Sequence, residues 1–130
     1  MDIEVARSVI AAILADAARA APDEACGLLL GAPGIVQAVP TRNVHQTPRS
    51  HFEIDQAALI AAHKAERGGG PVLAGYWHSH PSGPPDPSAT DRASASGDGR
   101  VWAIAGAGRV TFWRDHPGGF ESLSYSLVDG

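Results

Sequence analysis

The sequence predicts an α/β fold in which a mixed β-sheet is flanked by helices. Apolar residues recur at three- and four-residue steps in two segments, as they do in amphipathic helices. Several short apolar runs, bounded by glycine or proline, have the composition of strands. These two kinds of segment are interspersed along 130 residues without an internal repeat or a long linker, so one domain with one core is expected.

The first predicted helix begins at Asp2, which can cap it, and ends at Pro22. One apolar helical face is formed by Ile3, Val9, Ile10, Ile13, Leu14 and Ala17. The many alanines of residues 11–21 also favour a helix, because alanine has the highest helix propensity. Two strands are predicted next, at residues 26–30 and 35–39, joined by a turn that contains glycine and proline.

A polar loop at residues 41–50 precedes a short strand expected at residues 52–54. Asp55 is predicted to cap a second helix, which ends at the glycines of residues 68–70. The remaining predicted elements are a strand at residues 72–77, a helix from Ser88 to about Ser96, and strands at residues 101–105, 109–113 and 120–127. This order of strands and helices is typical of a mixed sheet with flanking helices.

Composition and charge argue against several classes of protein. Ten Lys and Arg residues against fourteen Asp and Glu residues give a net charge of −4, so a nucleic-acid-binding surface is not expected. No apolar run approaches the roughly 20 residues that span a membrane, and the acidic start of the chain does not resemble a signal peptide. The single cysteine, Cys26, cannot form an internal disulfide, which suits the reducing cytoplasm. We expect a cytoplasmic protein without nucleic-acid or membrane partners.

The most informative segment is His78-Ser79-His80, at the end of the strand predicted for residues 72–77. Side chains two residues apart in a strand point to the same face, so His78 and His80 can meet at one metal ion while Ser79 points away. Asp91 follows a proline-rich turn and lies in the first turn of the helix that Ser88 is predicted to cap. Two histidines and one carboxylate leave a fourth tetrahedral position open for water, which is typical of a catalytic zinc site.

Each of these residues has an ordinary structural explanation when it is taken alone. A lone histidine is usually a surface or core residue, and Ser88 with Asp91 alone would be a helix cap. Together, at this spacing, the four residues favour a metal site: His78, His80, Ser88 and Asp91. Glu24 is the candidate general base, because a carboxylate near the metal can take a proton from water and return it to a leaving amine. By itself, Glu24 would be a solvated loop residue.

The other polar and aromatic candidates have structural explanations. Cys26 lies in an apolar run that raises the pKa of a thiol and makes it inert, and one cysteine cannot supply the ligands of a zinc deaminase. His45 and His51 are the best remaining histidines for a role in the site, because their loop precedes a strand that could border the cleft. Surface or structural positions are expected for His63 and His116, and core positions for Trp77, Trp102 and Trp113.

The sequence resembles the JAMM (MPN+, JAB-domain) zinc metallopeptidases, whose pattern is a glutamate followed at a distance by H-S/T-H, seven residues, S, two residues and D. The positions of this pattern are occupied by Glu24, His78, His80, Ser88 and Asp91. The similarity covers almost the whole chain and includes residues 24–31, 43–44 and 52–55. The compact length is similar to the prokaryotic branch, which includes peptidases of sulfur-carrier and ubiquitin-like proteins. The resemblance implies one domain over residues 1–130 with the MPN (JAB, cytidine-deaminase-like) fold.

The resemblance also implies a role for each residue of the pattern. His78, His80 and Asp91 would bind one zinc ion per chain, Glu24 would activate water, and Ser88 would stabilise the oxyanion. The implied substrate is the amide bond after the C-terminal glycine of a ubiquitin-like or sulfur-carrier protein that ends in Gly-Gly, and the enzyme would be a monomer or a homodimer. Two alternatives stay open: a non-catalytic MPN module that binds a ubiquitin-like partner, and a zinc hydrolase of a small amide.

Overall fold

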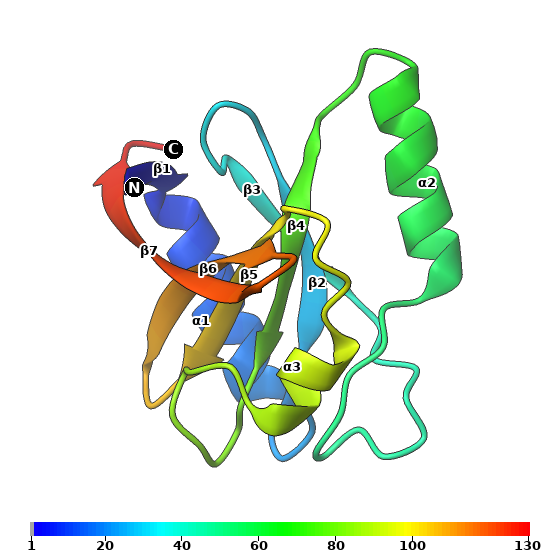
Figure 1. The fold of residues 1–130 in the computed structure, drawn as a ribbon, viewed down its shortest axis with the longest axis vertical. Helices are drawn as coiled ribbons and strands as arrows, with labels where there is room; N and C mark the ends of the chain where they lie inside the picture. Colours follow the sequence, from blue (N-terminus) through cyan, green and yellow to red (C-terminus); the bar gives the residue numbers. More distant parts are fainter. Residues whose placement is uncertain (1) are drawn as a thin grey trace.

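The computed structural model describes residues 2–130, which form one mixed sheet and three helices (Figure 1). The strands are β1 (Asp2–Ala6), β2 (Cys26–Leu30), β3 (Gln37–Thr41), β4 (Leu73–Ser79), β5 (Val101–Gly106), β6 (Arg109–His116) and β7 (Gly119–Val128). The helices are α1 (Arg7–Ala20), α2 (Gln56–Arg67) and α3 (Ala89–Ser94). This architecture confirms the predicted α/β class.

The sheet has the strand order β1-β7-β6-β5-β4-β2-β3 and curls until its two edges meet. The amide of Ala6 donates to the carbonyl of Ile35 at 2.9 Å, and the amide of Ile35 donates to the carbonyl of Glu4 at 2.9 Å. Helix α1 packs on strands from both ends of this order, including β1 and β3, and buries Val9 and Ile13. The main core therefore lies between α1 and the concave side of the sheet.

Strands β4 and β5 lie side by side near the middle of the sheet and pair in parallel. Strand β5 is buried along its whole length, and Trp77 of β4 is only 1% exposed in the α1 core. A second apolar cluster contains Cys26, Leu28 and Ile54. Because parallel strands are normally covered on both faces, a polar side chain at the end of β4 lies in a largely desolvated setting.

The prediction of a helix from Asp2 was wrong for the first five described residues. Residues 2–6 form β1, which pairs in parallel with β7 from Asp2 opposite Ser124 to Ala6 opposite Val128. Helix α1 begins only at Arg7, and its N-cap residue, Ala6, makes no side-chain cap bond. The partner strand comes from the far end of the chain, so pairing between distant segments overrides the local helical pattern.

Two further predictions near the middle of the chain were partly wrong. The strand expected at residues 35–39 lies at residues 37–41, because Ile35 is used in a bridge with Val5 instead. Residues 52–54 are not a strand, since only Ile54 makes an isolated bridge, to Asn43. The predicted cap of α2 is confirmed: the Asp55 carboxylate accepts the amide of Ala57 at 3.2 Å.

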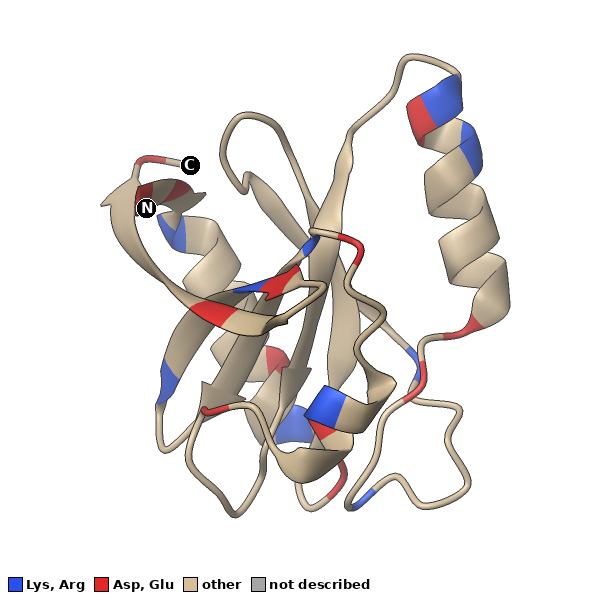
Figure 2. Ribbon diagram, in the orientation of Figure 1, with Lys and Arg blue, Asp and Glu red and all other residues tan. Residues whose placement is uncertain are grey.

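Charged side chains are distributed over several helices, strands and loops of the described chain (Figure 2). Within residues 2–130, no helix combines the length and the apolar character that crossing a membrane requires. Helix α2 stands apart from the rest of the ribbon and buries none of its residues (Figure 1). The candidate site is positioned by β4, by α3 and by the loops beside them.

Candidate metal centre

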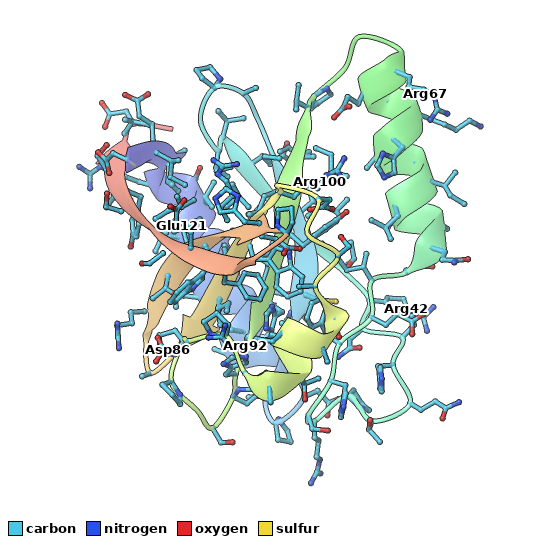
Figure 3. The ribbon with its side chains drawn as sticks, viewed as in Figure 1. Arg42, Arg67, Asp86, Arg92, Arg100 and Glu121 are labelled. Carbon is cyan, nitrogen blue, oxygen red and sulfur yellow. The ribbon has the colours of Figure 1, made fainter. Side chains whose placement is uncertain are left out.

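The three predicted metal ligands come together at the C-terminal end of β4. His78 Nε2 lies 3.2 Å from His80 Nε2 and 3.0 Å from Asp91 Oδ1, and His80 Nε2 lies 3.1 Å from Asp91 Oδ2. One donor atom from each residue is within 4.8 Å of the other two. Figure 3 shows α3, marked by Arg92, beside this end of β4. The structure thus brings a strand, the loop after it and a short helix to one point.

The backbone around the histidines explains why they share a face. Ser79 turns away as predicted, and its hydroxyl accepts the amide of Ala25 at 2.8 Å. The amide of His80 donates to the carbonyl of Ala105 at 2.7 Å, which continues the β4–β5 pairing beyond the end of β4. The alternation of side chains in extended backbone then directs His78 and His80 to the same side.

The two ring nitrogens of His80 have different partners, because Nδ1 faces a backbone carbonyl and Nε2 faces His78 and Asp91. His80 Nδ1 is 2.8 Å from the carbonyl oxygen of Pro84. Because a carbonyl can only accept, Nδ1 carries a proton, and Nε2 is the nitrogen that would bind a metal when the ring is neutral. His78 Nε2 and the Asp91 carboxylate complete the kind of donor set that divalent zinc-type metals prefer. The residues present therefore fit a divalent metal ion with three protein ligands.

Burial and mutual hydrogen bonding shift the ionisation of the three ligands. Burial lowers the pKa of His78 below its usual value and so favours a neutral ring. Burial acts in the same direction on His80, but hydrogen bonds to Asp91 and to the Pro84 carbonyl outweigh it and raise its pKa. Burial would raise the pKa of Asp91, but hydrogen bonds from both histidines hold it well below its usual range. Protons and a metal ion therefore compete for the Asp91 carboxylate and for the ring nitrogens of the two histidines.

The predicted capping box at the start of α3 is present. The Ser88 hydroxyl accepts the amide of Asp91 at 3.0 Å, and the Asp91 carboxylate accepts the amide of Ser88 at 3.0 Å. Asp91 is 3% exposed, whereas Ser88 is exposed. The cap therefore directs the Asp91 carboxylate inward and leaves Ser88 at the surface of the site.

Glu24 lies beside the ligands, in a cleft of about 410 Å³ that is also lined by His80 and Ser88. It is 8% exposed, and its backbone is tied to the loop that follows β3. Its amide donates to the carbonyl of Pro48 at 2.8 Å, and its carbonyl accepts Asn43 Nδ2 at 3.0 Å. The structure thus brings together the acid-base candidate and the three metal-ligand candidates.

Burial raises the pKa of Glu24 from 4.5 to about 7; His80 lowers it and Asp91 raises it. We therefore expect the Glu24 carboxyl of metal-free protein to titrate near neutral pH, measured by carbon NMR and assigned with Glu24→Gln. Because folding raises the pKa of Glu24, its protonated carboxyl adds to the free energy of unfolding at pH values below the unfolded-state pKa. This contribution is lost as the pH rises through about 7. The Glu24→Gln protein should consequently lose less stability between pH 5 and pH 8. A Glu24 titration near 4.5 would contradict this expectation.

His45 and His51 stack on each other, with ring centroids 4.6 Å apart and an interplanar angle of 13°. Both rings approach the hydroxyl of Thr47, at 3.0 and 3.2 Å. The group of metal-ligand candidates found in residues 2–130 contains neither of them. Cys26 is a buried free thiol whose pKa is raised to about 11 by burial, in agreement with the inert role expected for it.

Two residues near the ligands received no individual role from the sequence. The Phe52 ring stacks on His78, and Asn43 Nδ2 donates to the carbonyls of Glu24 and His51. Both residues lie in stretches that carry the family resemblance, and this was the only sequence signal that could have indicated them. Their contacts join segments distant in sequence, so local periodicity could not predict them.

Comparisons with known proteins identify the family of this chain. The family model described as prokaryotic homologs of the JAB domain matches residues 6–116. A desampylase from Haloferax volcanii is 37% identical over 110 residues, which cover 82% of this chain and 79% of that protein. A probable TtuB-protein conjugate cleaving protease from Thermus thermophilus is 37% identical over 87 residues, which cover 67% of this chain and 59% of that protein.

A solution structure of a protein from Desulfitobacterium hafniense superimposes with a TM-score of 0.83 and 28% identity, covering 100% of this chain and 94% of that one. The range matched by the family model includes every residue of the predicted site, from Glu24 to Asp91. These matches confirm the expected JAB/MPN fold. The chain therefore belongs to the family of prokaryotic homologues of the JAB domain.

Proposed function

We propose that this chain is a zinc-dependent metallopeptidase that hydrolyses the amide bond after the C-terminal glycine of a ubiquitin-like or sulfur-carrier protein. The observation that carries this proposal is the convergence of three donor atoms from His78, His80 and Asp91 within 4.8 Å. Family membership supports the reaction type. The two relatives, a desampylase and a probable protease that cleaves a protein conjugate, support a protein substrate.

Each polar residue of the site has a distinct part in this reaction. Zinc held by His78, His80 and Asp91 would polarise the scissile carbonyl and make water more acidic. Glu24 takes the proton from the attacking water and returns it to the leaving amine. The Ser88 hydroxyl already accepts the Asp91 amide, so its own proton is free to donate to the carbonyl oxygen as negative charge develops.

The wall of the cleft suits a substrate tail without side chains. Pro81, Gly83 and Pro84 line the cleft together with Ser88. A Gly-Gly tail can lie close to this backbone, because it carries no Cβ next to the scissile bond. We assign the activity to residues 1–130 as a single domain, and we place the protein in the cytoplasm, which agrees with its buried free Cys26.

The test is a zinc titration of chelator-stripped protein by calorimetry, followed by incubation with a carrier protein fused through its Gly-Gly tail to a second protein. We expect one tight zinc site per chain and zinc-dependent release of the fused protein. A matched fusion with bulky residues in place of the two glycines should be cleaved slowly. Tight zinc binding without cleavage of any carrier fusion would favour the non-catalytic module. Cleavage of small acyl amides alone would favour a zinc hydrolase of a small amide.

Replacing Ser88 with alanine should lower kcat by about 10²–10³-fold, the usual effect of removing one oxyanion donor. The loss of the N-cap should also lower the free energy of unfolding by about 1 kcal/mol. Ser88→Thr keeps a hydroxyl and an N-cap residue, so it should retain most of the kcat and most of the free energy of unfolding. Steady-state cleavage and thermal unfolding separate the two effects. Unchanged kcat in a folded Ser88→Ala protein would show that the hydroxyl does not act on the oxyanion.

A further inference from the structure

The two histidine ligands are held in different ways. His80 Nδ1 has the Pro84 carbonyl as its partner, whereas His78 Nδ1 is buried without a hydrogen-bond partner in the described part of the chain. The His78 side chain is 0% exposed. Metal-binding histidines almost always donate the second ring N–H to an acceptor, which fixes the orientation of the ring. Another contact must therefore fix the orientation of His78.

Two aromatic residues enclose the His78 ring. The Phe52 ring lies nearly parallel to it, with centroids 4.2 Å apart and an interplanar angle of 16°. Trp102 meets it edge-on, at 5.7 Å and 88°. Trp102 also meets Phe52 edge-on, at 5.9 Å and 77°, so the three rings form one packed unit. Both geometries are favourable arrangements of aromatic rings.

The position of Phe52 is itself well determined. Asn43 donates to the carbonyl of His51, the residue before Phe52, and pairs with Ile54 in an isolated bridge. The same Asn43 amide group donates to the carbonyl of Glu24. The loop that carries Phe52 is thus anchored on both sides of the ring, and one anchor also holds the acid-base residue.

We propose that Phe52 is a positioning residue that fixes the plane of the His78 ring by stacking, as the Pro84 carbonyl does by hydrogen bonding for His80. Rotation of the His78 ring about its Cβ–Cγ bond would move Nε2 away from its position 3.0 Å from Asp91 and 3.2 Å from His80 Nε2. The parallel Phe52 ring opposes this rotation, because a tilted imidazole would collide with it. This inference rests on the metal site of the proposed function.

The test uses Co²⁺ as a spectroscopic probe in the full chain. Phe52→Leu should weaken Co²⁺ binding by about tenfold, measured by chelator competition, and should change the visible absorption spectrum of the bound ion. Phe52→Tyr keeps the ring and should keep both properties. Phe120→Leu is the matched control, because Phe120 packs on Trp102 at 4.9 Å and 65° and is half-buried like Phe52. This control should retain the affinity and spectrum of the parent.

Parental affinity and spectrum in Phe52→Leu would overturn the inference. An equal loss in Phe120→Leu would also overturn it, because the effect would then be one of general packing. If circular dichroism shows that Phe52→Leu does not fold, Phe52→Met replaces it, since methionine fills a similar volume without a ring. A folded parent that binds no Co²⁺ would overturn the metal site itself, and with it the proposed function. A parent that binds Co²⁺ equally well without the Phe52 ring would overturn only this inference.

Discussion

Replacing Glu24 with glutamine should leave metal binding intact and lower kcat by about 10²–10⁴-fold. Glutamine has nearly the same shape as glutamate, but its amide cannot accept the proton of the attacking water. The hydrogen bonds to Pro48 and Asn43 involve only the Glu24 backbone and should survive the substitution. Glu24 is also outside the group of three metal-ligand candidates. Calorimetric zinc titration and steady-state cleavage of a Gly-Gly-tailed fusion, made on the same preparation, measure both quantities.

The matched control for this experiment is Glu53→Gln. Glu53 is an exposed carboxylate in a nearby loop, and its backbone amide donates to Asn43. The substitution removes the same charge without touching the cleft, so both zinc affinity and kcat should equal those of the parent. Near-parental hydrolysis by the Glu24→Gln protein would mean that another group takes the proton. Loss of zinc from that protein would instead make Glu24 a metal ligand.

Replacing Asp91 with alanine should abolish both zinc binding and turnover. Asp91 supplies the only anionic donor of the group, and its two oxygens lie 3.0 and 3.1 Å from the ring nitrogens of His78 and His80. The affinity for zinc should fall by more than about 100-fold, the upper end of the effect of removing an outer-shell partner. Calorimetry of chelator-stripped protein, with the cleavage assay beside it, measures the loss.

Asp91 also stabilises the start of α3, so a control must separate folding from metal binding. In Asp91→Asn, the side-chain carbonyl can still accept the amide of Ser88, and the helix start should persist. Asp86→Ala is the matched control for charge, because Asp86 is exposed and lines the cleft beside Glu24 and His80. Asp91→Asn should bind zinc weakly and Asp86→Ala should bind it normally. Parental zinc affinity in a folded Asp91→Ala protein would contradict the three-ligand site.

The direction of each ligand side chain could be predicted because it follows from local rules, whereas the convergence of Asp91 with the histidines also requires the proline-rich loop between them to fold back. The two-residue alternation of extended backbone puts His78 and His80 on one face. The capping pattern that begins at Ser88 directs Asp91 inward three residues later. Each rule acts within a few residues, so it needs no knowledge of the rest of the fold. Glu24 was the candidate base because a hydrolytic metal site needs a carboxylate near its water, and the family resemblance supported that choice.

Several features could not be predicted because they depend on contacts between distant segments. Residues 2–6 carry part of a helical pattern, yet they form a strand with the end of the chain. The raised pKa of Glu24 arises from burial, and its backbone is held by the loop that follows β3. The stacking of Phe52 on His78 joins an irregular loop to a central strand. Periodicity within a short window contains no information about such contacts.

The sequence by itself determined the α/β class, the family and the identity of the residues that could bind and use a metal. Only the tertiary structure decided that the curled sheet closes between Ala6 and Ile35, that Glu24 is desolvated beside His80, and how each histidine ring is held. The physical reason is the range of the interactions. Side-chain direction and helix capping are set by backbone geometry over a few residues, whereas strand pairing, burial and ring stacking arise when the whole chain packs.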